Sequence, residues 1–204
     1  MAIKASNLIL SVRQKLNDKE PARYKFTTPE VVDAINMALA VISNDLLFFN
    51  RTWEIKCNKE KARYRLPADF VKIISIKLNG KKIDNIKSLE AYESMSDICS
   101  KPVAIIDNIS LRVYDVTDDD KIIIEYNYIE HIDDENSEID TSLLLSEPIV
   151  LYAASVLFQN PVFKDGLQRS VFHANAFFQK MEYVRSRLKN NSNSKNIRSQ
   201  FRGV

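Results

Sequence analysis

The chain has few residues of the types that carry catalysis or hold metals. It contains two histidines, His131 and His173, and two cysteines, Cys57 and Cys99, and none of the four has a partner at zinc-ligand spacing. No G-x-S-x-G, Walker, Rossmann or H-E-x-x-H pattern occurs, and three glycines are few for a Gly-rich nucleotide-binding fold. We therefore expect no catalytic residue, no metal, no cofactor and two unpaired, reduced thiols.

Two acidic segments bracket one apolar run: "DVTDDDK" at residues 115–121 and "EHIDDENSEID" at residues 130–140. A calcium loop would need the order D-x-[DN]-x-[DN]-G, and neither segment contains a glycine. Two interpretations stay open, solvated loops or an electrostatic contact surface. The contact candidates are Asp118, Asp119, Asp120, Asp133 and Asp134.

The C-terminal end of the chain is basic. Between residues 180 and 204 the only acidic residue is Glu182, and the basic residues are Lys180, Arg185, Arg187, Lys189, Lys195, Arg198 and Arg202. Such a segment can neutralise phosphates, fold onto an acidic protein surface, or simply keep a frayed end soluble. Phe201 beside two arginines favours docking, because aromatic and arginine residues anchor interfaces.

These candidates fall into two groups. Arg185 and Arg187 join the acidic residues as candidates for contacts with a second copy of the chain or with another protein. The docking candidates of the terminal segment are Lys195, Ile197, Arg198, Phe201 and Arg202.

Helical periodicity predicts elements at both ends of the chain. Apolar residues at helical spacing predict a helix over residues 5–16 and a second helix that Thr28 caps, with Pro29 at its first position. Two more helices are expected over residues 146–160 and 165–189, separated at Asn160-Pro161. The last helix should bury one stripe, made of Leu167, Val171, Ala174, Phe178, Met181 and Leu188.

The middle of the chain alternates apolar and polar residues, which predicts short strands. Asn79-Gly80 is the strongest hairpin signal, because a type I′ turn needs positive φ at both central residues. The sequence thus predicts an α+β protein with three parts. Residues 1–50 and 142–189 should form a four-helix bundle, residues 51–141 an inserted antiparallel β module, and residues 190–204 an extended tail that is mobile in a free monomer.

The order of these segments resembles the head-to-tail adaptor, or neck, proteins of short-tailed bacteriophages. The resemblance rests on "VRQKLND" followed by "RYKFTTPEVVDAINMALAVI", on "YRLPADFVKIISIKLNG", and on "LYAASVLFQNPVFKDGLQRSVFHANAFFQKM". It implies a structural virion protein at the head–tail junction, assembled in the host cytoplasm and not bound to a membrane. It also implies a dodecameric ring under the portal protein, a tail or nozzle protein as the next partner, and DNA that passes through the lumen without sequence-specific binding.

One alternative function remains open on the sequence. The basic last helix and tail could serve a nucleic-acid-binding module. Against this, the formal net charge is only +2, the middle of the chain is acidic, and no helix-turn-helix or RNA-reading signature occurs.

Overall fold

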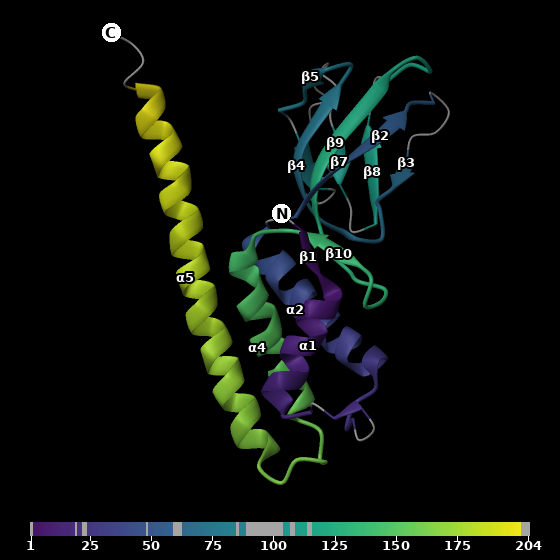
Figure 1. Ribbon diagram of the computed structural model, residues 1–204. Helices are drawn as coiled ribbons and strands as arrows, with labels where there is room; N and C mark the ends of the chain where they lie inside the picture. Colours follow the sequence, from purple (N-terminus) through teal and green to yellow (C-terminus); the bar gives the residue numbers. More distant parts are fainter. Residues whose placement is uncertain are drawn as a thin grey trace. The chain divides into compact units, whose positions relative to one another are not determined.

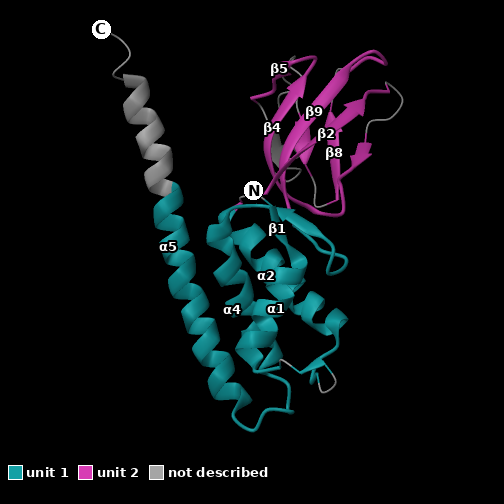
Figure 2. Ribbon diagram, in the orientation of Figure 1, with its two compact units in different colours: residues 1–46, 130–204 teal, residues 47–129 magenta. Residues whose placement is uncertain are grey.

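The computed structural model describes residues 2–18, 20–21, 24–47, 49–58, 63–84, 86–88, 104–106, 109–113 and 116–200, without the side chains of residues 86–88 and 189–200. The chain divides into two compact units (Figure 2): unit 1 contains residues 1–46 and 130–204, and unit 2 contains residues 47–129. Helices and mostly antiparallel sheets make up the described residues, so the predicted mixture of helix and sheet is confirmed. A regular four-helix bundle stays a prediction.

Unit 1 is built around one central helix. Its helices are α1 (Ala5–Leu16), α2 (Thr28–Leu46), α4 (Ser146–Leu157) and α5 (Gly166–Gln200), with a short 3-10 helix, η2 (Leu143–Leu145), before α4. Helix α4 contacts α1, α2 and α5 (Figure 1). It buries residues on nearly all sides, including Ile149, Leu151, Ala153 and Ala154, as expected of a helix enclosed by others.

The two N-terminal helices form where the periodicity predicts them. The expected stripe of α1 is buried, and α2 buries Val31, Ile35, Leu39 and Ile42 of its own. The cap of α2 differs from the prediction by one residue. Thr27 and Glu30 form a capping box, in which the Thr27 N–H donates to Glu30 Oε2 at 2.7 Å and the Glu30 N–H donates to Thr27 Oγ1.

A two-stranded sheet that the periodicity did not predict joins the ends of unit 1. Strand β1 (Ala2–Lys4) pairs antiparallel with β10 (Glu138–Asp140). The first N–H groups of α1 donate to carbonyls of the preceding loop, Ala5 to Ser137 at 2.9 Å and Ser6 to Glu135 at 3.0 Å. These bonds satisfy donors that a helix start leaves unpaired. They link α1 to the loop before β10, and residues 130–141, which the sequence analysis places in the β module, belong to unit 1.

Aromatic rings fix the corner between α4 and α5. The Phe158 ring stacks on the His173 ring at 5.2 Å and lies 4.8 Å from the Phe163 ring. Gly166 begins α5 where a Cβ would overlap the carbonyl oxygen of Phe158, so only glycine allows this close approach. The break expected at Asn160-Pro161 lies within this corner, after α4 ends at Leu157.

Helix α5 is longer than the sequence predicts, and it buries a different face from the predicted one. It continues through Gln200, whereas residues 190–204 were expected to be extended; once a helix exists, each added residue gains a hydrogen bond without a new nucleation cost. Of the predicted stripe, Met181 is buried, but Leu167, Val171 and Phe178 are exposed. The buried side chains of α5, among those described through Leu188, are instead Ser170, His173, Phe177, Met181 and Val184.

Unit 2 consists of two four-stranded sheets. The first has the order β2 (Asn50–Lys56), β9 (Lys121–Tyr128), β4 (Phe70–Leu78), β5 (Lys81–Lys82). The second has the order β3 (Arg63–Arg65), β8 (Ser110–Val113), β7 (Ala104–Ile106), β6 (Ile86–Ser88). The strands pair antiparallel except β6 with β7, which is parallel.

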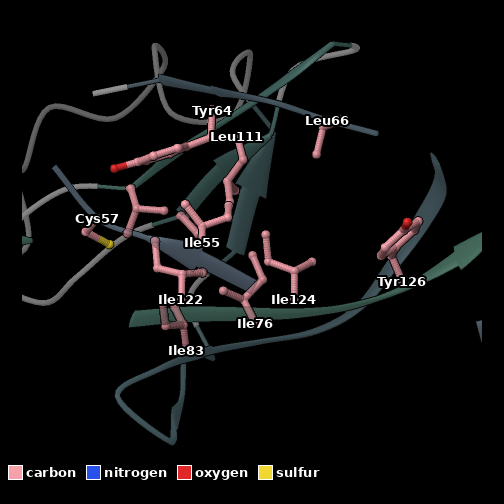
Figure 3. Close-up of a cluster of buried hydrophobic side chains, with 12 residues drawn as sticks. Ile55, Cys57, Tyr64, Leu66, Ile76, Ile83, Leu111, Ile122, Ile124 and Tyr126 are labelled. Atoms are coloured by element: carbon pink, nitrogen blue, oxygen red, sulfur yellow. The ribbon is translucent and has the colours of Figure 1, made fainter. Parts of the chain in front are cut away.

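Both sheets contribute to one buried cluster. Ile76, Ile122 and Ile124 come from the first sheet, and Tyr64 and Leu111 come from the second (Figure 3). The side chains of the two sheets point toward one another in this cluster, as in a β-sandwich. Unit 2 therefore has a hydrophobic core of its own.

The predicted hairpin turn is confirmed in its backbone. Asn79 and Gly80 have φ of 47° and 79°, the left-handed values that a type I′ turn requires. The strand before it departs from simple alternation, because β4 shifts register between Ile73 and Ser75. This bulge leaves Ile74 exposed while Ile76 is fully buried, although the sequence places both on one face.

Candidate interaction surfaces

The first acidic candidates lie in unit 2, before β9. Asp118 and Asp119 are exposed, whereas Asp120 is occupied by internal hydrogen bonds. Its carboxylate accepts from the Thr117 N–H at 2.6 Å and from Asn79 Nδ2 at 2.5 Å. The Thr117 N–H, and then Asn79, hold the pKa of Asp120 below its ordinary value. Asp120 thus fixes the hairpin turn to the start of β9.

The second acidic candidates lie in unit 1, in the loop before β10. Asp134 Oδ1 accepts from the N–H groups of Asn136 at 2.9 Å and Ser137 at 3.0 Å, and the Asn136 N–H is the main cause of its lowered pKa. Asp133 is exposed and lies 3.4 Å from His131 Nδ1. The acidic candidates are therefore divided between the two units, with Asp118, Asp119 and Asp120 in unit 2 and Asp133 and Asp134 in unit 1.

The basic side chains along the described part of α5 have partners within unit 1. Arg185 Nη2 donates to both carboxylate oxygens of Asp45 in α2, at 2.6 Å to Oδ1 and 2.5 Å to Oδ2. Arg185 also forms an ion pair with Glu182. The Asp45 hydrogen bonds raise the pKa of Arg185. Lys180 pairs with Glu147 at 2.8 Å.

Arg187 and the terminal candidates complete the predicted basic set. Arg187 Nε donates to the Tyr183 hydroxyl at 3.0 Å. Lys195, Ile197 and Arg198 belong to the last turns of α5, and their side chains are not described. Phe201 and Arg202 lie outside the described residues.

A groove in unit 1 was not predicted from the sequence. It has a volume of about 740 Å³ and runs between β1–α1 on one side and η2–α4 on the other. Its lining combines apolar side chains with two lysines and one glutamate; the residues are Ala2, Ile3, Lys4, Asn7, Leu8, Ser11, Gln14, Lys15, Leu143, Ser146, Glu147 and Val150. The groove could not be predicted from a local residue pattern, because its two walls come from segments that are more than a hundred residues apart in the sequence.

The structure offers little that resembles reaction chemistry. Within the described ranges, no group of three or more His, Cys, Asp or Glu side chains could hold a metal ion. Cys57 is a free cysteine in the core of unit 2, where burial raises the pKa of its thiol; Cys99 lies outside the described residues. No described helix is long and apolar enough to span a bilayer.

Comparison with known proteins identifies a family for this chain. The SU10 adaptor protein family matches residues 3–199, which include both units and nearly all of α5. No curated protein matches the sequence. The family agrees with the resemblance to head-to-tail adaptors, and an adaptor is a structural protein and not an enzyme. The chain belongs to the SU10 adaptor protein family and is a bacteriophage virion protein of the adaptor class.

Proposed function

We propose that this adaptor forms a ring under the portal, extends the DNA channel and offers the next tail component a platform. The observation that carries the proposal is the extent of the family match, residues 3–199, because it includes both units and is not confined to one of them. In this proposal unit 1 forms a ring of twelve subunits, unit 2 contacts a tail or nozzle protein, and DNA passes through the lumen without sequence-specific contacts. Assembly takes place in the host cytoplasm.

The length of α5 supports portal docking by the C-terminal segment. Helix α5 has 35 residues, whereas its partner α4 has 12. Among the side chains described through Leu188, the last buried one on α5 is Val184. The helix therefore continues for about 24 Å past Val184, at about 1.5 Å per residue. The sequence from Arg185 onward contains no acidic residue, so this end of the helix suits an acidic surface.

Ion pairs within unit 1 weigh against the nucleic-acid-binding alternative. Lys180, Arg185 and Arg169 of α5 each pair with a carboxylate of the same unit. Phosphates would have to compete with these carboxylates for the same cations. Nucleic-acid binding would therefore depend mainly on the terminal basic residues, which are the same residues that the adaptor proposal assigns to portal docking.

The test compares the mass of the protein alone with its mass on purified portal. We expect a monomer alone and a ring on the portal, and a variant that lacks residues 190–204 should not attach. A second variant, R198Q/R202Q, should weaken attachment. Its matched control is K81Q/K82Q, which removes two positive charges from β5 in unit 2 and should attach normally.

The possible outcomes separate the parts of the proposal. Attachment of the truncated protein would refute docking by the terminal segment. Single subunits on the portal would refute the ring. DNA binding that weakens steeply with added salt and is lost in R198Q/R202Q would favour the nucleic-acid alternative.

A further inference from the structure

Helix α5 has a second apolar stripe that unit 1 does not cover. Leu167, Val171 and Phe178 are 76%, 51% and 60% exposed. At about 100° per residue these three side chains lie within about 40° of one another around the helix. Their stripe is centred about 100° from the buried stripe that packs on α4. A helix that is apolar in two directions has room for two neighbours.

The stripe and the groove between α1 and α4 adjoin opposite flanks of α5. Arg185 follows Leu167 by 18 residues, about five turns, so it continues the line of the stripe. It pairs with Asp45, which places this flank toward α2. Lys180 lies on the other flank and pairs with Glu147, a residue that lines the groove. A subunit therefore cannot seat its own stripe in its own groove.

The stripe and the groove match in length and in apolar character. From Leu167 to Phe178 the stripe extends about 17 Å, at about 1.5 Å per residue. The α1 residues that line the groove, Asn7 to Lys15, extend about 12 Å along the helix, and residues 2–4 of β1 lengthen the same wall. Ile3, Leu8, Leu143 and Val150 line the groove, so it presents apolar walls to an apolar helix face.

The charges beside the two surfaces are also complementary. Asp45 and Glu182 both pair with Arg185 beside the stripe, so among these described side chains two carboxylates face one cation. The groove contains Lys4 and Lys15, and its one carboxylate, Glu147, is already paired with Lys180. Approach of the stripe to the groove would therefore bring unlike charges together.

We propose that the α5 stripe of one subunit packs into the α1–α4 groove of the next copy of this chain. This interface rests on the proposed ring, because it is the contact that would close it. One copy carries both surfaces at different places, so the contact is head-to-tail and repeats around an axis. Burial of the stripe would also remove an exposed apolar row that favours non-specific association.

The first test compares two variants of α5 on purified portal. In L167S/V171S/F178S the stripe becomes polar, and we expect loss of the ring with the C-terminal segment intact, so that single subunits still attach. The matched control is F172S, because Phe172 is 69% exposed on the same helix but lies about 120° away from the stripe. The control should form rings as the wild-type protein does, and circular dichroism should show equal helix content in both variants.

The second test locates the partner surface. Val171→Cys on the stripe and Ser11→Cys in the groove should form a disulfide when the two single variants are mixed on the portal, and neither should do so alone. Cross-linking of V171C with itself would mean that stripes pair with each other, which overturns the proposal. Rings formed by the triple variant would overturn it too, while the ring itself would stand. Wild-type protein that stays monomeric on the portal would remove the proposed ring, and this interface with it.

Discussion

Replacement of Arg13 by methionine should be among the most damaging changes in unit 1. The Arg13 and Asp18 side chains are only 4% and 2% exposed and form an ion pair at 3.0 Å. Arg13 also donates to the Phe26 carbonyl at 3.0 Å, and Asp18 Oδ1 accepts from the Lys25 N–H at 2.8 Å. The variant R13M keeps most of the side-chain volume but leaves a buried carboxylate without its cation.

The expected cost follows from this burial. Breaking a buried pair from one side costs about 3–5 kcal/mol, because the remaining charge stays desolvated. The hydrogen bonds give a similar figure, since bonds that involve a charged group contribute about 1.5–3 kcal/mol each and Arg13 makes two short ones. For a chain of this size the melting temperature should fall by about 2–4 °C for each kcal/mol.

The assay is urea unfolding of the full chain, followed by far-ultraviolet circular dichroism for the helices of unit 1 and by Trp53 fluorescence for unit 2. The control is K121M in unit 2, which breaks the 2.6 Å pair between Lys121 and Glu54, two side chains that are more than half exposed. That change should cost less than about 1 kcal/mol. The double variant R13M/D18L should recover part of the loss, because it leaves no buried charge. If R13M costs no more than K121M, the assignment of Arg13–Asp18 as a buried pair that holds the α1–α2 connection is wrong.

Two other predictions concern single positions in the two units. Gly80→Ala should destabilise unit 2 by about 1–2 kcal/mol from its left-handed backbone alone, because an added Cβ meets nothing within 4 Å; Trp53 fluorescence in urea measures it, and an unchanged midpoint would contradict the type I′ turn. His173 should make unit 1 less stable in mild acid. Burial, with Lys15 and Arg169 nearby, lowers its pKa from 6.5, so the folded state binds fewer protons, and stability that is full above about pH 6.5 falls as the pH drops through that value. H173F keeps the stack on Phe158 and should flatten this dependence in thermal melts, whereas an equally steep dependence in the variant would exclude His173 as its source.

Helices with one apolar face were predictable from the sequence. In α1 and α2 the apolar residues recur at helical spacing on a single side, so the predicted stripe and the buried stripe coincide. The hairpin at Asn79-Gly80 was predictable for a similar reason, because few residue pairs tolerate positive φ twice in succession.

Other features depend on tertiary contacts that periodicity does not carry. Strand β1 has three residues, and its partner β10 lies at the C-terminal end of the acidic segment 130–140, far from β1 in the sequence. The bulge in β4 inverts the direction of Ile74 without any glycine to mark it. Arg13 and Asp18 look like residues of an ordinary polar connection, and only the fold of the Tyr24–Phe26 segment over them makes them a buried pair.

The acidic candidates differ in what their carboxylates do in the structure. Asp120 and Asp134 were grouped with their neighbours because all are carboxylates in one part of the chain. In the structure both accept backbone hydrogen bonds from their own turns, and their pKa values are lowered by those bonds. The charge of Asp120 and Asp134 therefore has a local structural role within their own turns.

The two stripes of α5 explain why its orientation could not be predicted and why the error is informative. Either stripe alone satisfies the helical period, and the choice between them depends on which one meets α4. Phe177 and Val184 fit there because Tyr152 packs edge-on against the Phe177 ring at 5.0 Å, and α4 has no further side to offer once α1 and α2 also cover it. Apolar side chains that stay exposed in one subunit do not contribute to the hydrophobic core that stabilises the monomer. In a protein whose family role is to join other virion components, the assembly contact proposed above explains the stripe of Leu167, Val171 and Phe178, which the described side chains of unit 1 leave exposed.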